Sequence, residues 1–220
     1  KRIYDRLVNE KNFTGSYSSV RDAVRRLRAE HEIPPQSDIP LTYDPGEAVQ
    51  IDWGEATVYI DGQKTKISLF CARLCNSCDI LVQAYRTQNQ ETFLEAQQRA
   101  FDFFGGVPRR VIFDNAKVAV KEGFGLYAKP QDKYLSFSAH YAFTLDFCNP
   151  AKGNEKGLVE NLVGYARRNF FVPVPRVDDM KSLNEQLWQL CLNYRATHKV
   201  AGRNQSVSEL YAIEKEYLNP

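Results

Sequence analysis

The sequence predicts an α/β domain in which helices flank a mixed five-stranded sheet, preceded by a short basic helical segment. Two changes of pattern along the chain support this prediction. Apolar residues recur at helical spacing up to about residue 31, and four prolines then fall within residues 32–47. From position 47 onward three strand-like runs come first, and helical and strand-like segments alternate after them. This order favours a mixed sheet with helices on its faces.

Composition and charge narrow the class of protein. The 220 residues suffice for one large domain with a small appendage, and an apolar content of 43% can form a substantial core. Residues 1–28 carry eight Lys or Arg against three acids, a net charge of +5, whereas the remaining residues sum to −3. A basic end on a mildly acidic body favours contact with nucleic acid. Since the sequence shows neither a signal peptide nor a long apolar run, we expect a reducing cytosol and no membrane partner.

The cysteines could in principle bind zinc. Cys75 and Cys78 have the spacing of half a zinc site, but no second pair follows and no histidine is nearby in sequence. We therefore interpret them as strand or turn thiols.

Residues 1–32 predict two helices joined by a turn, as in a helix-turn-helix DNA-binding segment. The second helix begins at a serine cap and carries four candidate DNA-binding residues: Arg21, Arg25, Arg26 and Arg28. A short basic helix after a Gly-containing turn fits a DNA-recognition helix, and a solvated helical hairpin fits the pattern equally well. Two helices are too few for an independent domain of this kind, so we expect the segment to be incomplete.

The prolines predict a linker over residues 33–46, which leaves 47–215 as the core and 216–220 as an extension. Strands are predicted at 47–54, 64–74, 79–86, 109–114 and 144–147, of which the first three form an antiparallel meander. Helices are predicted at 90–104, 154–171 and 181–198, the first closed by a Gly pair. Residues 121–133 are predicted to form a mobile loop.

Two aspartates stand in apolar strands. Asp52 lies between Ile51 and Trp53 in "QIDWG", and a buried carboxylate is costly unless something compensates it. Asp114 ends the strand "VIFDN", and the carboxyl ends of strands form the ligand crevice of open α/β sheets. If the two strands are neighbours, the carboxylates meet and require a cation, for which Mg²⁺ or Mn²⁺ is suited. Either aspartate alone could instead close a turn or cap a helix.

A third carboxylate, Glu160, lies in the predicted helix "NEKGLVENLVGYARRNFF". Lys156 is four residues before it and Arg167 seven after it, so all three share one helix face. This arrangement fits a site that holds a metal and binds phosphates, although an ordinary surface Lys–Glu pair has the same spacing. Glu155 is a rival, but it lies at the helix start, where the helix dipole alone stabilises an acid.

In this order, "QIDWGE", "FDNAK" and "KGLVE" resemble the Asp-Asp-Glu transposases and retroviral integrases, which have an RNase H-like core. The resemblance extends over about residues 10–215 and is to the IstA-type transposases of bacterial insertion sequences, in which a helix-turn-helix region precedes the catalytic core. One departure is the 45 residues between Asp114 and Glu160, a longer gap than that of integrases. The segment 121–133 could absorb the difference.

The resemblance implies that Asp52, Asp114 and Glu160 are the catalytic residues and bind two Mg²⁺ or Mn²⁺ ions, with Arg167 in contact with DNA. One ion would activate water for end cleavage and then the freed 3′-hydroxyl for strand transfer, and the other would stabilise the leaving oxygen. The implied partners are double-stranded transposon ends and target DNA, further copies of the chain in a dimer or higher oligomer, and an ATPase helper protein, in the nucleoid-associated cytoplasm of a bacterium.

Two other functions fit the same sequence. A DNA-binding module could keep the fold without the activity, and a metal titration would distinguish it from an enzyme. An RNase H-type nuclease acting on RNA–DNA hybrids would share the carboxylates, but the predicted helix-turn-helix segment is typical of proteins that bind duplex DNA.

Overall fold

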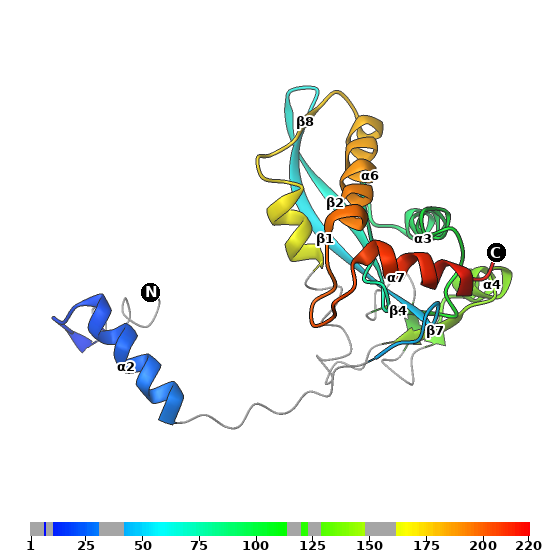
Figure 1. Ribbon diagram of the computed structural model, residues 1–220. Helices are drawn as coiled ribbons and strands as arrows, with labels where there is room; N and C mark the ends of the chain where they lie inside the picture. The colour runs from blue at the N-terminus through cyan, green and yellow to red at the C-terminus, as the bar shows by residue number, and fades with distance from the viewer. Residues whose placement is uncertain (1–6, 8–10, 31–41, 114–119, 123–128, 148–161) are drawn as a thin grey trace. The chain divides into compact units, whose positions relative to one another are not determined.

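A computed structural model of the chain describes residues 7, 11–30, 42–113, 120–122, 129–147 and 162–220 (Figure 1). The chain forms two compact units, Lys1–Pro40 and Leu41–Pro220, and each is described here by itself. Several residues with predicted roles lie outside the described residues: Asp114, Glu155, Lys156 and Glu160. The side chain of Arg28 is also outside them.

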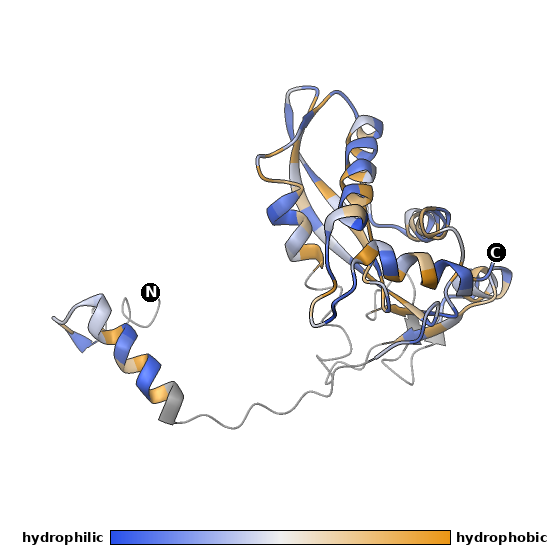
Figure 2. Cartoon of the chain, in the orientation of Figure 1, coloured by the Kyte–Doolittle hydropathy of each residue, from blue (hydrophilic) through white to orange (hydrophobic). Residues whose placement is uncertain are grey.

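The N-terminal unit contains α2 (Tyr17–Glu30), a basic amphipathic helix. The Ser16 hydroxyl accepts a hydrogen bond from the backbone N–H of Ser19 at 3.2 Å, so the helix has a serine cap, two residues before the predicted start of the helix at Ser18. Val20 is buried, whereas Arg21, Arg25 and Arg26 are exposed. Figure 2 shows hydrophobic residues interspersed among hydrophilic ones along this helix. The exposed arginines leave the charged surface of α2 available for a partner.

The second unit is built on a sheet with the strand order β3-β2-β1-β4-β7. The first three strands pair antiparallel as a meander: β1 (Ala48–Ile60), β2 (Gln63–Leu74) and β3 (Ile80–Tyr85). On the other side of β1, the strands β4 (Arg110–Phe113) and β7 (Thr144–Phe147) pair in parallel. The predicted mixed five-stranded sheet is confirmed. A sixth short strand that was not predicted, β8 (Arg176–Val177), pairs with the far end of β1.

The region predicted as a mobile loop contains regular structure. β5 (Val120–Glu122) pairs with β6 (Lys129–Pro130), and α4 (Asp132–His140) follows directly. The helix was missed because it is short and only Tyr134 and Ser138 are buried in it, which is too few apolar contacts to produce a helical period in the sequence. Tertiary packing stabilises it, since the Tyr134 ring lies 5.0 Å from that of Phe93.

Helices cover both faces of the sheet, and each face is identified by one residue of β1. Side chains alternate along a strand, so Ile51 and Asp52 lie on opposite faces. On the face of Ile51, α3 (Gln90–Phe104) and α4 pack against Phe113, to which Phe93 and Tyr134 come within 5.9 and 5.4 Å. On the face of Asp52 lie a helix at residues 162–169 and α6 (Met180–Thr197).

The C-terminal segments pack on this framework. α7 (Val207–Glu214) contacts α6, and η2 (Lys215–Tyr217) follows it (Figure 1). Asn219 then exchanges backbone hydrogen bonds of 2.7 and 2.8 Å with Val107, so the compact unit extends past the predicted limit at residue 215. At the other end, the Tyr43 carbonyl accepts a 2.7 Å hydrogen bond from the Asn76 side chain, which joins part of the predicted linker to the same unit.

Candidate functional site

Asp52 lies in β1 at the point where the strand passes from buried to partly exposed positions. Ile51 is buried, and Asp52 and Trp53 are half-buried. The carboxylate is therefore more accessible than its apolar neighbours in the sequence suggested. Trp53 points to the opposite face, where its ring packs edge-on against Phe70 at 5.4 Å and Tyr85 at 5.8 Å. This packing holds the strand in place beside Asp52.

The end of β4 lies beside Asp52. In the parallel register of β1 and β4, Ile51 pairs with Phe113. Each of these residues immediately precedes a predicted catalytic aspartate, Asp52 in one strand and Asp114 in the other. The two strands are neighbours, which was the condition for the predicted carboxylate site, although Asp114 itself is outside the described residues. The carboxyl end of a parallel strand is also where open α/β sheets place ligands.

On the other side of β1, Asp52 pairs with Cys71 of β2. Cys71 is fully buried, and burial raises the pKa of its thiol well above the ordinary value. The negative charge of Asp52 raises this pKa further, and the positive charge of Arg167 lowers it. Asp52 of β1 and Arg167 of the helix at 162–169 therefore both influence the pKa of the buried Cys71 thiol, in opposite directions.

The helix at 162–169 lies directly on the strand that carries Asp52. A Cβ atom placed on Gly54 would come within 2.5 Å of Val163 Cγ1. Arg167 Nε donates a 2.7 Å hydrogen bond to the backbone carbonyl of Glu55. Leu162, Val163 and Ala166 are buried, and Arg167 is exposed apart from this contact. Of the predicted site residues, Asp52 and Arg167 are thus brought together in the structure.

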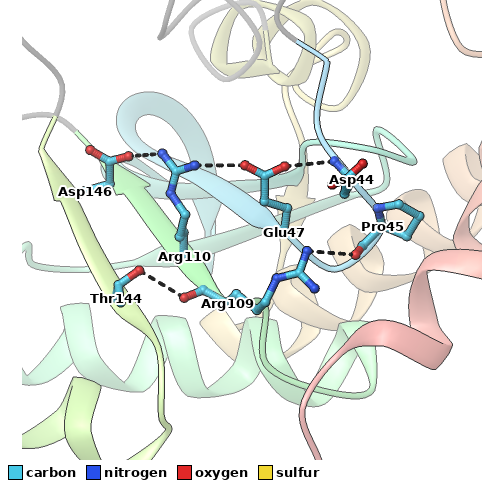
Figure 3. Close-up of polar contacts among 7 residues, drawn as sticks. All are labelled: Asp44, Pro45, Glu47, Arg109, Arg110, Thr144 and Asp146. Carbon is cyan, nitrogen blue, oxygen red and sulfur yellow. Dashed lines mark hydrogen bonds and ion pairs between the residues drawn. The ribbon is translucent and has the colours of Figure 1, made fainter.

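A further carboxylate, Asp146 of β7, faces the same side of the sheet and was not singled out from the sequence. It pairs in register with Ile112, which in turn pairs with Gln50, two residues before Asp52. Figure 3 shows that Asp146 forms an ion pair with Arg110, whose other terminal nitrogen lies 2.8 Å from Glu47. These contacts give Asp146 a structural role that ties β7 to the beginnings of β1 and β4.

The remaining predicted site residues lie either outside the described residues or in the N-terminal unit. Lys156, Glu160 and the rival Glu155 are outside the described residues, and Arg21, Arg25 and Arg26 belong to the separate N-terminal unit. Among the described residues, no group of three or more His, Cys, Asp or Glu side chains is arranged to hold a metal ion. Cys75 and Cys78 are buried in the turn between β2 and β3. None of the described helices is both long and apolar enough to cross a membrane.

Comparison with curated proteins relates the chain to one group of enzymes. A transposase of Aminobacter aminovorans is 34% identical over 100% of this chain and 44% of its own length. The transposase for insertion sequences IS1326/IS1353 of Pseudomonas aeruginosa is 32% identical over 94% of this chain and 42% of its own length. The chain is a homologue of IS21/IS1326-type insertion-sequence transposases. It spans about half the length of the curated relatives it matches, or less. No family model matches the sequence.

Solved structures confirm the fold of this transposase homologue. The HTLV-2 integrase catalytic core domain in complex with magnesium superposes with a TM-score of 0.54 at 12% identity, over 78% of this chain and 99% of that domain. A chain of the simian T-cell lymphotropic virus intasome gives a TM-score of 0.55 at 15% identity, over 76% of this chain and 54% of that one. The core of the transposase homologue therefore has the RNase H-like α/β fold of retroviral integrase cores.

Proposed function

We propose that the chain contains the catalytic core of a DNA transposase, which hydrolyses phosphodiester bonds at transposon ends and joins the freed 3′-hydroxyls to target DNA. The observation that carries the proposal is the Ile51–Phe113 pair, because it sets Asp52 beside the strand that leads into Asp114. This arrangement occurs in an integrase-like fold and in a homologue of insertion-sequence transposases.

The proposed cofactor is a pair of Mg²⁺ or Mn²⁺ ions. Asp52 fits this cofactor, because a half-exposed carboxylate can give oxygen ligands to a hard cation that keeps part of its water. Asp114 and Glu160 would supply the other carboxylates. When bound, such ions supply an activated oxygen nucleophile and stabilise the leaving oxygen. The magnesium in the HTLV-2 integrase core supports the choice of metal.

The chain's own residues would bind and orient the DNA. Arg167, exposed on the helix beside Asp52, carries a positive charge suited to a phosphate, and Lys156 would add a second. In the N-terminal unit, Arg21, Arg25, Arg26 and Arg28 would contact the transposon end. The proposal also includes a dimer or higher oligomer on DNA and an ATPase helper, as the resemblance to IstA-type transposases implies.

The test is substitution of each proposed metal ligand in the full chain. We expect Asp52→Asn, Asp114→Asn and Glu160→Gln each to abolish Mg²⁺-dependent cleavage and strand transfer on a transposon-end duplex, because neutral amides are poor ligands for a hard cation. The melting temperature should hold or rise, since each change removes a negative charge from a carboxylate cluster. Cleavage is measured on labelled duplexes, and unfolding by circular dichroism.

Glu155→Gln is the matched control, because it makes the same change five residues before Glu160 in the sequence. Its turnover should stay close to that of the unaltered chain. Normal turnover in Glu160→Gln together with loss in Glu155→Gln would reassign the third ligand. DNA binding that requires no metal, together with the absence of cleavage by the unaltered chain, would instead favour the inactive DNA-binding module.

A further inference from the structure

One stretch of β1 contacts a helix where a neighbouring strand would ordinarily lie. β4 pairs with residues 48–51 of β1, and β8 pairs with residues 59–60 on the same side. Within the described chain, residues 53–58 are not paired with a strand on this side. Asp52 directly precedes this stretch.

Gly54 allows the helix at 162–169 to approach this stretch closely. Its backbone does not have the positive φ that favours glycine, so conformation does not explain the residue. The lack of space explains it, because any Cβ at this position would overlap the side chain of Val163, which is itself buried. The glycine in "QIDWG" thus lets a helix side chain rest on the strand backbone, two residues after Asp52.

Arg167 makes a second contact one residue further along the strand and one helical turn further along the helix. Its 2.7 Å hydrogen bond to the Glu55 carbonyl joins a charged donor to a backbone acceptor, a stronger interaction than one between neutral groups. Val163 and Arg167 are four residues apart, so both side chains extend from one helix face toward the same strand. Two adjacent strand residues are therefore held by two residues of one helix face.

We propose that Gly54, Glu55, Val163 and Arg167 form a strand–helix latch that sets the distance between Asp52 and the beginning of this helix, and that Gly54 and Arg167 are positioning residues for metal binding. The inference rests on the proposed function, because Glu160 precedes Leu162 by two residues in the sequence. It assigns Arg167 a task within the protein that does not require DNA. A metal held between a strand and a helix needs this distance fixed, and a 1 Å displacement can cost about 10²-fold in activity.

A pair of compensating substitutions tests the latch in the full chain. Gly54→Ala should weaken Mn²⁺ binding by about tenfold or more, measured by calorimetry without DNA, because the added methyl group displaces the helix. Val163→Ala in the same chain removes the atoms that the new methyl group meets, and it should restore most of the affinity. Val163→Ala alone should lower the melting temperature and weaken Mn²⁺ binding less than Gly54→Ala does, since it removes a contact without adding an overlap.

Gly164→Ala is the matched control on the helix. Its added Cβ would meet only the end of the flexible Arg168 side chain, at 3.1 Å, so Mn²⁺ affinity should not change. Arg167→Lys keeps the charge but loses the planar donor, and we expect it to weaken Mn²⁺ binding nearly as much as Arg167→Gln does. A residue that only contacts DNA would leave metal affinity unchanged in both Arg167 variants.

The outcomes separate the latch from the proposed function. Mn²⁺ affinity that falls in Gly54→Ala and returns in the double variant supports the latch. Unchanged affinity in Gly54→Ala, or no recovery in the double variant, overturns it while the proposed function stands. An unaltered chain that binds no Mn²⁺ and cleaves no DNA overturns the proposed function, and with it the role of the latch in metal binding.

Discussion

Asp79 closes the turn between β2 and β3, and its side chain is fully buried. Arg195 of α6 forms an ion pair with it at 2.7 Å and lies over the rings of Phe103 and Tyr211, 4.5 and 3.8 Å from their centroids. Glu214 of α7 is buried close by and accepts a 2.8 Å hydrogen bond from the Ser77 backbone N–H. The turn is therefore held by two buried acids from different parts of the chain.

Burial raises the pKa of Asp79 from 3.8 to about 6, although hydrogen bonding and the charge of Arg195 act in the opposite direction. The pKa of Glu214 is raised by burial as well. A carboxyl group whose pKa is higher in the folded state binds its proton more tightly there. Its stabilising contribution is full below the unfolded pKa and is lost as the pH rises through the folded pKa.

Asp79→Asn should therefore change the pH dependence of stability. The difference in melting temperature between the unaltered chain and this variant should shift in favour of the variant as the pH rises from about 4 to about 6, because only the unaltered chain then ionises a buried carboxyl group at this position. Glu214 is present in both proteins, so its own burial does not distinguish them. Calorimetric unfolding between pH 4 and 8 measures it, and a difference that stays constant over this range would contradict the prediction.

At the scale of elements, β3 is the edge strand of the described sheet, and side chains bond some of its outward backbone groups. The Asn184 amide of α6 bonds the Ala84 backbone on both sides, accepting from its N–H at 2.7 Å and donating to its carbonyl at 2.9 Å. Cys191 Sγ accepts a hydrogen bond from the Val82 N–H at 3.3 Å. These contacts cover an edge that could otherwise pair with another chain.

Asn184→Ala should lower the free energy of unfolding by about 1–3 kcal/mol, because the donor and the acceptor of buried Ala84 lose their partners. Amide hydrogen exchange at Ala84 should also become faster. Asn193→Ala, at an exposed position of the same helix, is the control and should change stability by less than about 0.5 kcal/mol. Urea unfolding of both variants measures the effect, and equal losses would show that the edge contact contributes nothing.

The elements that the sequence predicted are those with a strong local signal. β1, β2 and β3 alternate or run apolar between Gly- and Asn-containing turns, and α3 begins at an Asn89 cap and ends at Gly105 in the left-handed conformation. α4 and β8 have little periodicity of their own and depend on tertiary contacts. Local pattern cannot reveal such elements, because their stability arises from residues distant in the sequence.

The candidate site was likewise predictable only where the sequence itself carries a local signal. Asp52 could be selected because an acid inside an apolar run conflicts with burial, and the family resemblance supplied its partners. The role of Gly54 in "QIDWG" was not predictable, because it depends on Val163, 109 positions later in the sequence. Arg167 was predicted to contact DNA, and its hydrogen bond to the Glu55 carbonyl became apparent only once strand and helix were placed together.

At the scale of the whole molecule, the two units differ in how many apolar residues they bury. The main hydrophobic cluster is formed by residues between Val49 and Leu210, and its partly buried neighbours reach Leu218. None of these described core residues comes from the N-terminal unit. Val20 is buried on α2, but Leu27 of the same helix is 53% exposed. The second unit should therefore fold without the first, whereas α2 alone has too little buried surface for independent stability.

Deletion of residues 1–40 should consequently leave the melting temperature of the second unit within about 2 °C of its value in the full chain, and should remove selective binding to transposon ends.

A variant of the full chain with Arg21, Arg25 and Arg26 replaced by Gln should lose the same selectivity, because we expect the arginine charges, rather than the rest of the unit, to bind the DNA. If all three arginines neutralise phosphates, the slope of log K against log salt should become shallower by about 2.7. Fluorescence anisotropy at several salt concentrations measures this slope, with a scrambled duplex as the reference. An unchanged slope in the triple variant would remove these arginines from the DNA interface, whatever the truncated chain does.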